Sequence, residues 1–74
     1  MNQIDLHGMT HSQALEKTEN ALLLASQVPG FRFDIITGNS NTLQQKIIKN
    51  ILEKHNFSYY IFSSNLGKIT VIDK

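Results

Sequence analysis

Cysteine is absent from this chain of 74 residues, and long hydrophobic runs are absent too. Without cysteine, neither a disulfide framework nor a thiolate metal site can form, which suits a reducing cytoplasm. The longest apolar stretch, ALLLA at 21–25, is far shorter than the roughly 20 residues that cross a bilayer. The start, MNQIDLHG, also lacks the basic and apolar regions of a secretory signal. We therefore expect a cytoplasmic protein with no membrane partner.

A strong charge of either sign is also lacking, since the net charge is +1 at neutral pH. Composition by itself therefore does not indicate a polyanionic partner. Residues 1–40 hold two basic and four acidic side chains, a net −2, whereas residues 41–74 hold five lysines and two acids, a net +3. The basic half can face phosphates, although a lysine-rich helix face is more often solvated surface.

No repeat, low-complexity tract or linker divides the sequence, so we predict a single domain over residues 1–74. Period-two alternation predicts strands, and apolar residues at helical spacing behind good N-caps predict helices. The expected elements are a strand at 3–7, a helix from Thr10 to about Gln27, a strand at 31–37, a helix from the 39–42 turn to about His55, a strand at 57–62 and, after a hairpin turn at 63–67, a strand at 68–72.

This order, βαβαββ, predicts an α/β fold of the two-layer α+β sandwich type. Strand–helix–strand units favour parallel pairing with right-handed crossovers, and the closing hairpin adds one antiparallel strand. We expect a four-stranded mixed sheet with two helices on one face and the other face at least partly open, where a homodimer contact is possible. Tyr59, Tyr60 and Phe62 fall on alternate faces; on the open face they can stack on bases, although core or dimer contacts are commoner.

The first candidate site residues are Asp5 and His7, in the stretch IDLHG. Residues two apart on a strand point to the same side, so the carboxylate and the imidazole lie close together. The carboxylate can make the histidine a better base near neutral pH, or both can bind a divalent cation such as Mg²⁺ or Mn²⁺. Two protein ligands make a weak metal site, and outward polar residues on an edge strand are the commoner origin of this pattern.

A second polar cluster, TGNSNT at 37–42, lies between the central strand and the second helix. Ligands bind at such points in open α/β sheets, and a helix N-terminus offers N–H groups to a phosphate, although ordinary capping needs only one of these side chains. If the first two strands are parallel neighbours, the two clusters lie at one edge and indicate a phosphodiester site. Lys46 and Lys49 can hold flanking phosphates. The predicted phosphate-binding residues are Gly38, Asn39, Ser40, Asn41 and Thr42.

Together, IDLHGMTHSQAL and IITGNS…LQQKIIKNIL resemble the small MutS-related (Smr) domain family. The family opens with an L/I-D-L-H-G-L/M-T strand and has a later apolar strand ending in T-G-x-G or H-G-x-G. The resemblance implies a fold like the C-terminal domain of translation initiation factor three, nucleic-acid binding and, in several members, endonuclease activity on RNA or DNA. By position, Asp5 and His7 match the D-x-H element associated with cleavage, Gly8 the turn after it, and Thr37 and Gly38 the start of the glycine loop.

Asn39 and Ser40 depart from the family pattern, which has a basic residue and then glycine at these positions. We therefore expect the loop to keep phosphate binding while cleavage weakens, and we predict a nucleic-acid-binding Smr-like domain that is a weak endonuclease. His7 would be the general base or a metal ligand, and Asp5 its orienter or a second ligand. The alternative is a non-catalytic nucleic-acid-binding or protein-interaction module, in which Asp5 and His7 only brace the 38–42 loop.

Overall fold

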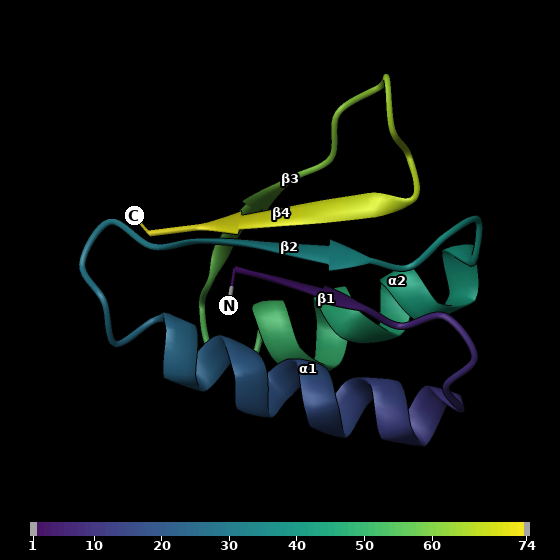
Figure 1. Cartoon of the computed structure of the whole chain (residues 1–74), viewed down its shortest axis with the longest axis horizontal. Helices are drawn as coiled ribbons and strands as arrows, with labels where there is room; N and C mark the ends of the chain where they lie inside the picture. Colours follow the sequence, from purple (N-terminus) through teal and green to yellow (C-terminus); the bar gives the residue numbers. More distant parts are fainter. Residues whose placement is uncertain (1, 74) are drawn as a thin grey trace.

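Four strands form one mixed sheet in the computed structural model, which describes residues 2–73. β1 and β2 run parallel, whereas β4 is antiparallel to both of its neighbours, in the order β1-β2-β4-β3 (Figure 1). The predicted parallel first pair and antiparallel last strand are therefore confirmed. The elements are β1 (Gln3–Asp5), α1 (His11–Ala25), β2 (Arg32–Ile36), α2 (Asn41–Ile47), the π-helical η1 (Ile48–Leu52), β3 (Ser58–Tyr60) and β4 (Lys68–Ile72).

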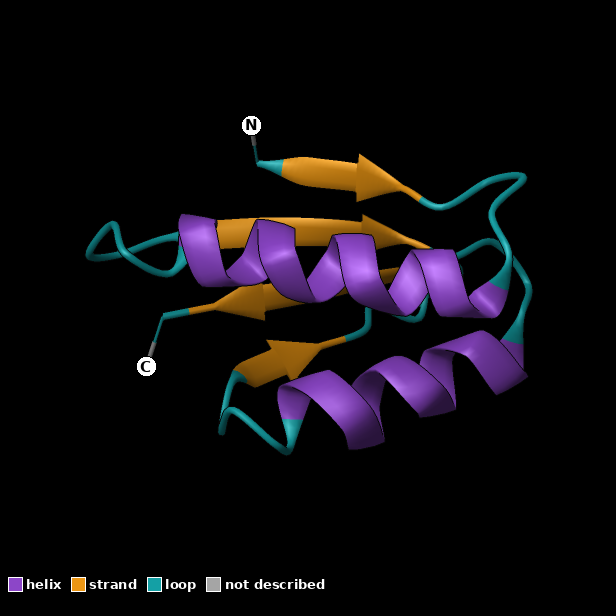
Figure 2. Ribbon diagram, turned by 90° about the horizontal axis from the view of Figure 1, so that it is seen from below, coloured by secondary structure: helices purple, strands orange, loops and turns teal. Residues whose placement is uncertain are grey.

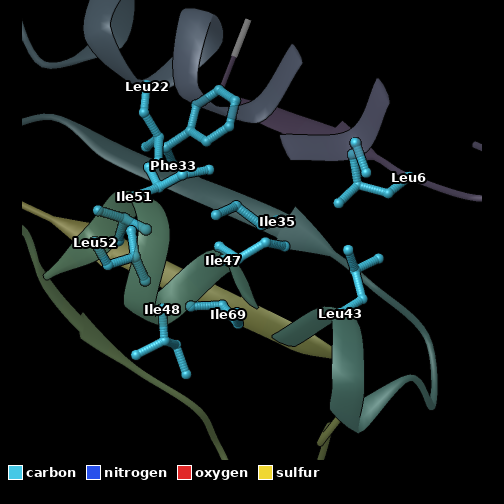
Figure 3. Close-up of a cluster of buried hydrophobic side chains, with 12 residues drawn as sticks. Leu6, Leu22, Phe33, Ile35, Leu43, Ile47, Ile48, Ile51, Leu52 and Ile69 are labelled. Carbon is cyan, nitrogen blue, oxygen red and sulfur yellow. The ribbon is translucent and has the colours of Figure 1, made fainter. Parts of the chain in front are cut away.

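Both helices lie on one face of the sheet and leave the other face bare (Figures 1 and 2). The alternation of side chains in the two central strands explains this arrangement. Phe33 and Ile35 of β2, with Ile69 and Val71 of β4, point toward the helices and are at most 1% exposed. The helices add Ala14, Leu22, Leu43, Ile47, Ile48, Ile51 and Leu52 to the same apolar cluster (Figure 3). The apolar residues at helical spacing in the second helix, Leu43, Ile47, Ile48, Ile51 and Leu52, are thus all buried.

The ends of the helices follow from local hydrogen bonds. Thr10 begins α1 with a reciprocal capping box, in which its hydroxyl accepts from the backbone N–H of Gln13 (3.1 Å) and its own N–H donates to the Gln13 side chain (3.3 Å). The second helix differs from the expected single α-helix to about His55. It is α-helical only to Ile47 and then widens into a π-helical turn, where the N–H of Glu53 donates to the carbonyl of Ile48 (2.8 Å).

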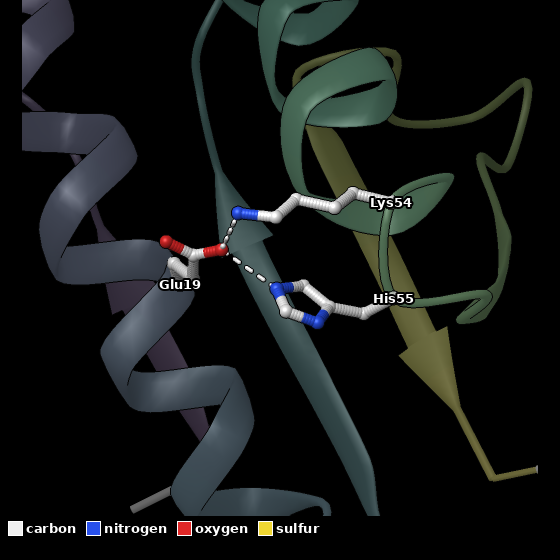
Figure 4. A network of polar contacts seen from close by, with 3 residues as sticks. All are labelled: Glu19, Lys54 and His55. Atoms are coloured by element: carbon white, nitrogen blue, oxygen red, sulfur yellow. Dashed lines mark hydrogen bonds and ion pairs between the residues drawn. The ribbon is translucent and has the colours of Figure 1, made fainter.

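One ion cluster ties the end of this second helix to the middle of α1 (Figure 4). Nε2 of His55 lies 2.6 Å from Oε2 of Glu19, and Nζ of Lys54 lies 3.4 Å from the same oxygen. The hydrogen bond from His55, helped by the charge of Lys54, holds the pKa of the Glu19 carboxyl below its ordinary value of 4.5, although desolvation acts in the opposite direction. The cluster thus links the two helices on the side away from the sheet. Within residues 2–73, neither helix has the length and apolar character needed to cross a membrane.

Candidate functional site

The carboxyl ends of the two parallel strands meet at one edge of the sheet. Asp5 and Ile36 are register partners, so their side chains project from the bare face side by side. With His7, Thr37 and Gly38, they line a pocket of about 220 Å³. The structure therefore brings the Asp5–His7 pair together with the first residues of the 37–42 turn.

The Asp5 carboxylate is engaged by the backbone of the same short segment. The N–H of His7 donates to Oδ1 of Asp5 at 3.0 Å, an Asx-type turn that fixes how the chain leaves β1. Gly8 lies in the turn that follows. Within residues 2–73 the imidazole of His7 forms no hydrogen bond, and the side chain is exposed. The carboxylate therefore positions the backbone of His7, and the imidazole is free to meet a ligand.

The opposite wall of the pocket is held by the hairpin between β3 and β4. The carbonyl of Gly67 accepts hydrogen bonds from the N–H groups of Thr37 (2.8 Å) and Gly38 (3.1 Å), and from the Thr37 hydroxyl (3.1 Å). A Cβ at position 67 would lie 3.1 Å from both the Cα and the carbonyl oxygen of Gly38, closer than ordinary van der Waals contact. The close approach of two backbones thus favours glycine at position 67.

Gln44 completes the support of this turn from within α2. Its side chain is 6% exposed, and its amide nitrogen donates to the Thr37 hydroxyl (2.9 Å) and to the carbonyl of Leu66 (2.6 Å). The hairpin and Gln44, rather than Asp5 and His7, therefore brace the turn, since within residues 2–73 neither Asp5 nor His7 forms a hydrogen bond to residues 38–42. Gln44 was not predicted from the sequence as a site residue, although a polar residue inside an apolar helical stripe indicates a buried hydrogen-bonding role.

The other side of Gly38 is open to a ligand. Its φ is +65°, and a Cβ built there would meet nothing within 4 Å. Ser40 is the N-cap of α2, and its hydroxyl accepts from the N–H of Leu43 (3.3 Å). In the described part of the chain, the N–H groups of Asn41 and Thr42 then keep their hydrogen-bonding capacity, as expected for the first residues of a helix. A hollow of about 180 Å³ here is lined by Gly38, Asn39, Asn41, Gln44 and Leu66.

Lys46 and Lys49 lie apart from these two pockets. Both are exposed, and with Thr42, Gln45 and Asn50 they line a separate hollow of about 440 Å³ along the second helix. Nζ of Lys46 lies 3.2 Å from Nδ1 of His11, at the start of α1. The structure therefore divides the predicted phosphate-binding residues between three hollows, the first two of which share Gly38, and Ser40 lines none of the three.

Asp5 and His7 are the acidic and histidine side chains that this pocket offers to a metal ion. Residues 2–73 contain no group of three or more acidic, histidine or cysteine side chains placed to hold an ion. Asp5 and His7 alone would leave most coordination positions of Mg²⁺ or Mn²⁺ to phosphate oxygens and water.

The fold and site define a small α+β domain with a polar pocket at the end of a parallel strand pair. Comparison with protein-family models, curated proteins and solved structures finds no match for the chain. The case for function therefore rests on the pocket itself.

Proposed function

We propose that this protein is a nucleic-acid-binding domain of the small MutS-related type, with a weak endonuclease activity on phosphodiester bonds of RNA or DNA. One observation carries the proposal: the D-x-H segment and the Thr-Gly turn, which are distant in sequence, line one pocket at the edge of the sheet. The order βαβαββ agrees with the likeness to the C-terminal domain of translation initiation factor three that the sequence motifs imply. The absence of cysteine agrees with a cytoplasmic location.

A backbone phosphate fits best on the Gly38 side of the pocket. Open space lies beside the Cα of Gly38, and the N–H groups of Asn41 and Thr42 start the adjacent helix. The Asp5 carboxylate repels a phosphate, so the anion lies away from it, between the imidazole of His7 and the turn. A protonated His7 adds a charge-assisted hydrogen bond to the phosphate.

The same placement lets His7 transfer a proton. A neutral imidazole takes the proton of an attacking water or ribose hydroxyl, the freed oxygen attacks phosphorus, and the bond to the leaving oxygen breaks as that oxygen gains a proton. Asp5 contributes through the backbone of His7 only, so the imidazole lacks the carboxylate partner that raises the efficiency of histidine bases. Cleavage is therefore slow. A Mg²⁺ or Mn²⁺ ion held by Asp5, His7 and the phosphate would supply positive charge to the phosphoryl oxygens.

A second candidate function is binding without cleavage, and the contact between Asp5 and the backbone of His7 favours it. In that case the Asp5 side chain shapes the turn that follows β1, and His7 only contacts the phosphate. The open sheet face would then serve a nucleic acid or a protein partner.

The two functions are separated by incubating the wild type, Asp5→Ala and His7→Ala with labelled RNA, single-stranded DNA and nicked duplex, with and without Mg²⁺ or Mn²⁺. His11→Ala is the matched control, because His11 lies outside the pocket. We expect slow cleavage by the wild type and His11→Ala that is lost in the other two variants. Binding without cleavage supports the second function, and cleavage that survives both pocket substitutions removes the proposed site. If the wild type binds no nucleic acid at low salt, where phosphate contacts are strongest, both functions are refuted.

A further inference from the structure

The bare face of the sheet is continuous with the candidate pocket. Asp5 projects from this face on β1, beside Ile36 of β2, and Lys68 of β4 is the register partner of Ile36 on its other side. A row of side chains therefore runs from the pocket toward β3. Three strand spacings of about 4.8 Å put β3 about 14 Å from β1, a distance that a few extended nucleotides cross.

Two aromatic rings lie on the β3 side of the bare face. Tyr60 is the register partner of Thr70, so it lies on the bare face, whereas its neighbour Tyr59 points to the helix side. The ring of Phe62 packs edge-to-face on Tyr60, with centroids 4.8 Å apart, and Phe62 is still 49% exposed. The connection between β3 and β4 rises from the sheet on the side away from the helices (Figure 1). The pair thus offers an aromatic surface beside the bare face.

The bare face is polar, and its two cations, Arg32 and Lys68, are matched by two carboxylates, Asp5 and Asp34. Asp34 accepts a hydrogen bond from the hydroxyl of Thr70 (2.9 Å), and Nε of Arg32 and Nζ of Lys68 lie 3.7 and 3.9 Å from its carboxylate. These last two distances are longer than hydrogen bonds, so both cations keep donors for a ligand. Lys68 lies between the pocket and the aromatic pair, whereas Arg32 lies at the opposite end of β2 from the pocket.

This composition suits a nucleic acid better than a second copy of the chain. The cores of dimer interfaces are depleted of charged residues, and two bare faces pressed together would bury both charge clusters. Exposed aromatic rings beside cations are the means by which proteins bind single strands, whose unpaired bases can stack on the rings. A duplex keeps its bases stacked on one another and offers none to Phe62.

We propose that the bare face is the path of a single-stranded nucleic acid. One base stacks on the Tyr60–Phe62 pair, Lys68 contacts the backbone, and a phosphate a few nucleotides away occupies the pocket of Asp5, His7, Thr37 and Gly38. This inference rests on the proposed function and defines its substrate as unpaired strand.

The test compares four labelled probes by fluorescence anisotropy: oligothymidine DNA, an abasic DNA strand of the same length, duplex DNA and oligouridine RNA. The abasic strand keeps every phosphate and removes every base. We expect both base-bearing single strands to bind, with an affinity about 5- to 150-fold higher than that of the abasic strand, because stacking on an aromatic side chain contributes that much per base. The duplex should also bind more weakly than either single strand.

Two variants place the effect on the bare face. Phe62→Ala should weaken oligothymidine binding about 5- to 150-fold and leave abasic binding unchanged. Tyr59→Ala is the matched control, since Tyr59 lies on the same strand, is 38% exposed and points the other way, so oligothymidine should bind it as it binds the wild type. Far-UV circular dichroism establishes that both variants fold. The comparison of abasic and base-bearing strands in the wild type independently tests whether bases contribute to binding.

Three results would overturn the inference while leaving the proposed function intact: equal affinity for abasic and base-bearing strands, unchanged oligothymidine binding by a folded Phe62→Ala variant, or tighter binding of the duplex than of the single strands. A wild-type dimer that Phe62→Ala separates into monomers would assign the face to a second copy and also overturn it. No binding of any probe at low salt would instead refute the proposed function, and this inference with it.

Discussion

Replacing Thr18 by valine should make the protein more stable, although the substitution removes a hydroxyl group. Thr18 lies in α1, is 0% exposed, and its hydroxyl has no hydrogen-bond partner among the described residues. A buried hydroxyl without a partner costs about 1–3 kcal/mol, and valine fills nearly the same volume with a methyl group. We expect Thr18→Val to raise the free energy of unfolding by about 1–3 kcal/mol, a large effect in a domain of this size.

Thr70 offers a matched control, since it is also buried, at 1% exposure, but its hydroxyl donates to Asp34 at 2.9 Å. Thr70→Val leaves the carboxylate without this donor, so the same substitution should lower the free energy of unfolding by about 1–3 kcal/mol. Urea and thermal unfolding followed by circular dichroism measure both, with a midpoint shift of about 4–8 °C per kcal/mol for a domain of this size. The reasoning fails if Thr18→Val is no more stable than the wild type, or if the two variants shift in the same direction.

Three further predictions concern the site and the ion cluster. Gly67→Ala should lower the free energy of unfolding by about 1–3 kcal/mol and weaken nucleic-acid binding, because its Cβ pushes against Gly38; an alanine variant as stable as the wild type in thermal unfolding would contradict the contact. Asp5→Asn keeps an oxygen for the N–H of His7 and removes one negative charge, so affinity at low salt should rise about fivefold in a titration; weaker binding would show that the charge is needed. Glu19 has a lowered pKa, so its contribution to stability is complete above about pH 4.5 and is lost as pH falls through that lowered value. Thermal midpoints of the wild type and Glu19→Gln should therefore converge in acid, and a constant difference between them would disprove the linkage.

The parts of the fold that follow from local pattern could be predicted from the sequence. Apolar residues at helical spacing, such as Ile47 and Ile51, marked the buried side of the second helix, and both are buried. The sequence pattern predicted a strand at 68–72, and β4 has these bounds. Local pattern did not predict the π-helical turn from Ile48, because single π turns inside an α-helix are rare and have no apolar spacing of their own that local sequence indicates.

The support of the candidate site could not be predicted in the same way. Its key hydrogen bonds join Thr37 to Gly67 and Gln44 to Leu66, contacts between segments that are distant along the chain. Local sequence indicates that Gln44 is polar in an apolar stripe, but it does not indicate which carbonyl the side chain meets. The role of Asp5 also differs from the predicted one, which was to orient the imidazole of His7. A carboxylate two residues before a histidine can accept a hydrogen bond from the ring or from the backbone, and the turn after β1 selects the backbone.

The position of β4 also constrains how the chain folds. β4 is the last strand in the sequence, yet it lies between β2 and β3 and forms ladders with both. During synthesis, β3 therefore has no partner in the sheet until residues 68–72 have emerged. Folding must wait for this segment and close long loops, which slows the process compared with a sheet built in sequence order. Loss of β4 would remove the middle of the sheet, so the chain is expected to fold in a single step that includes this strand.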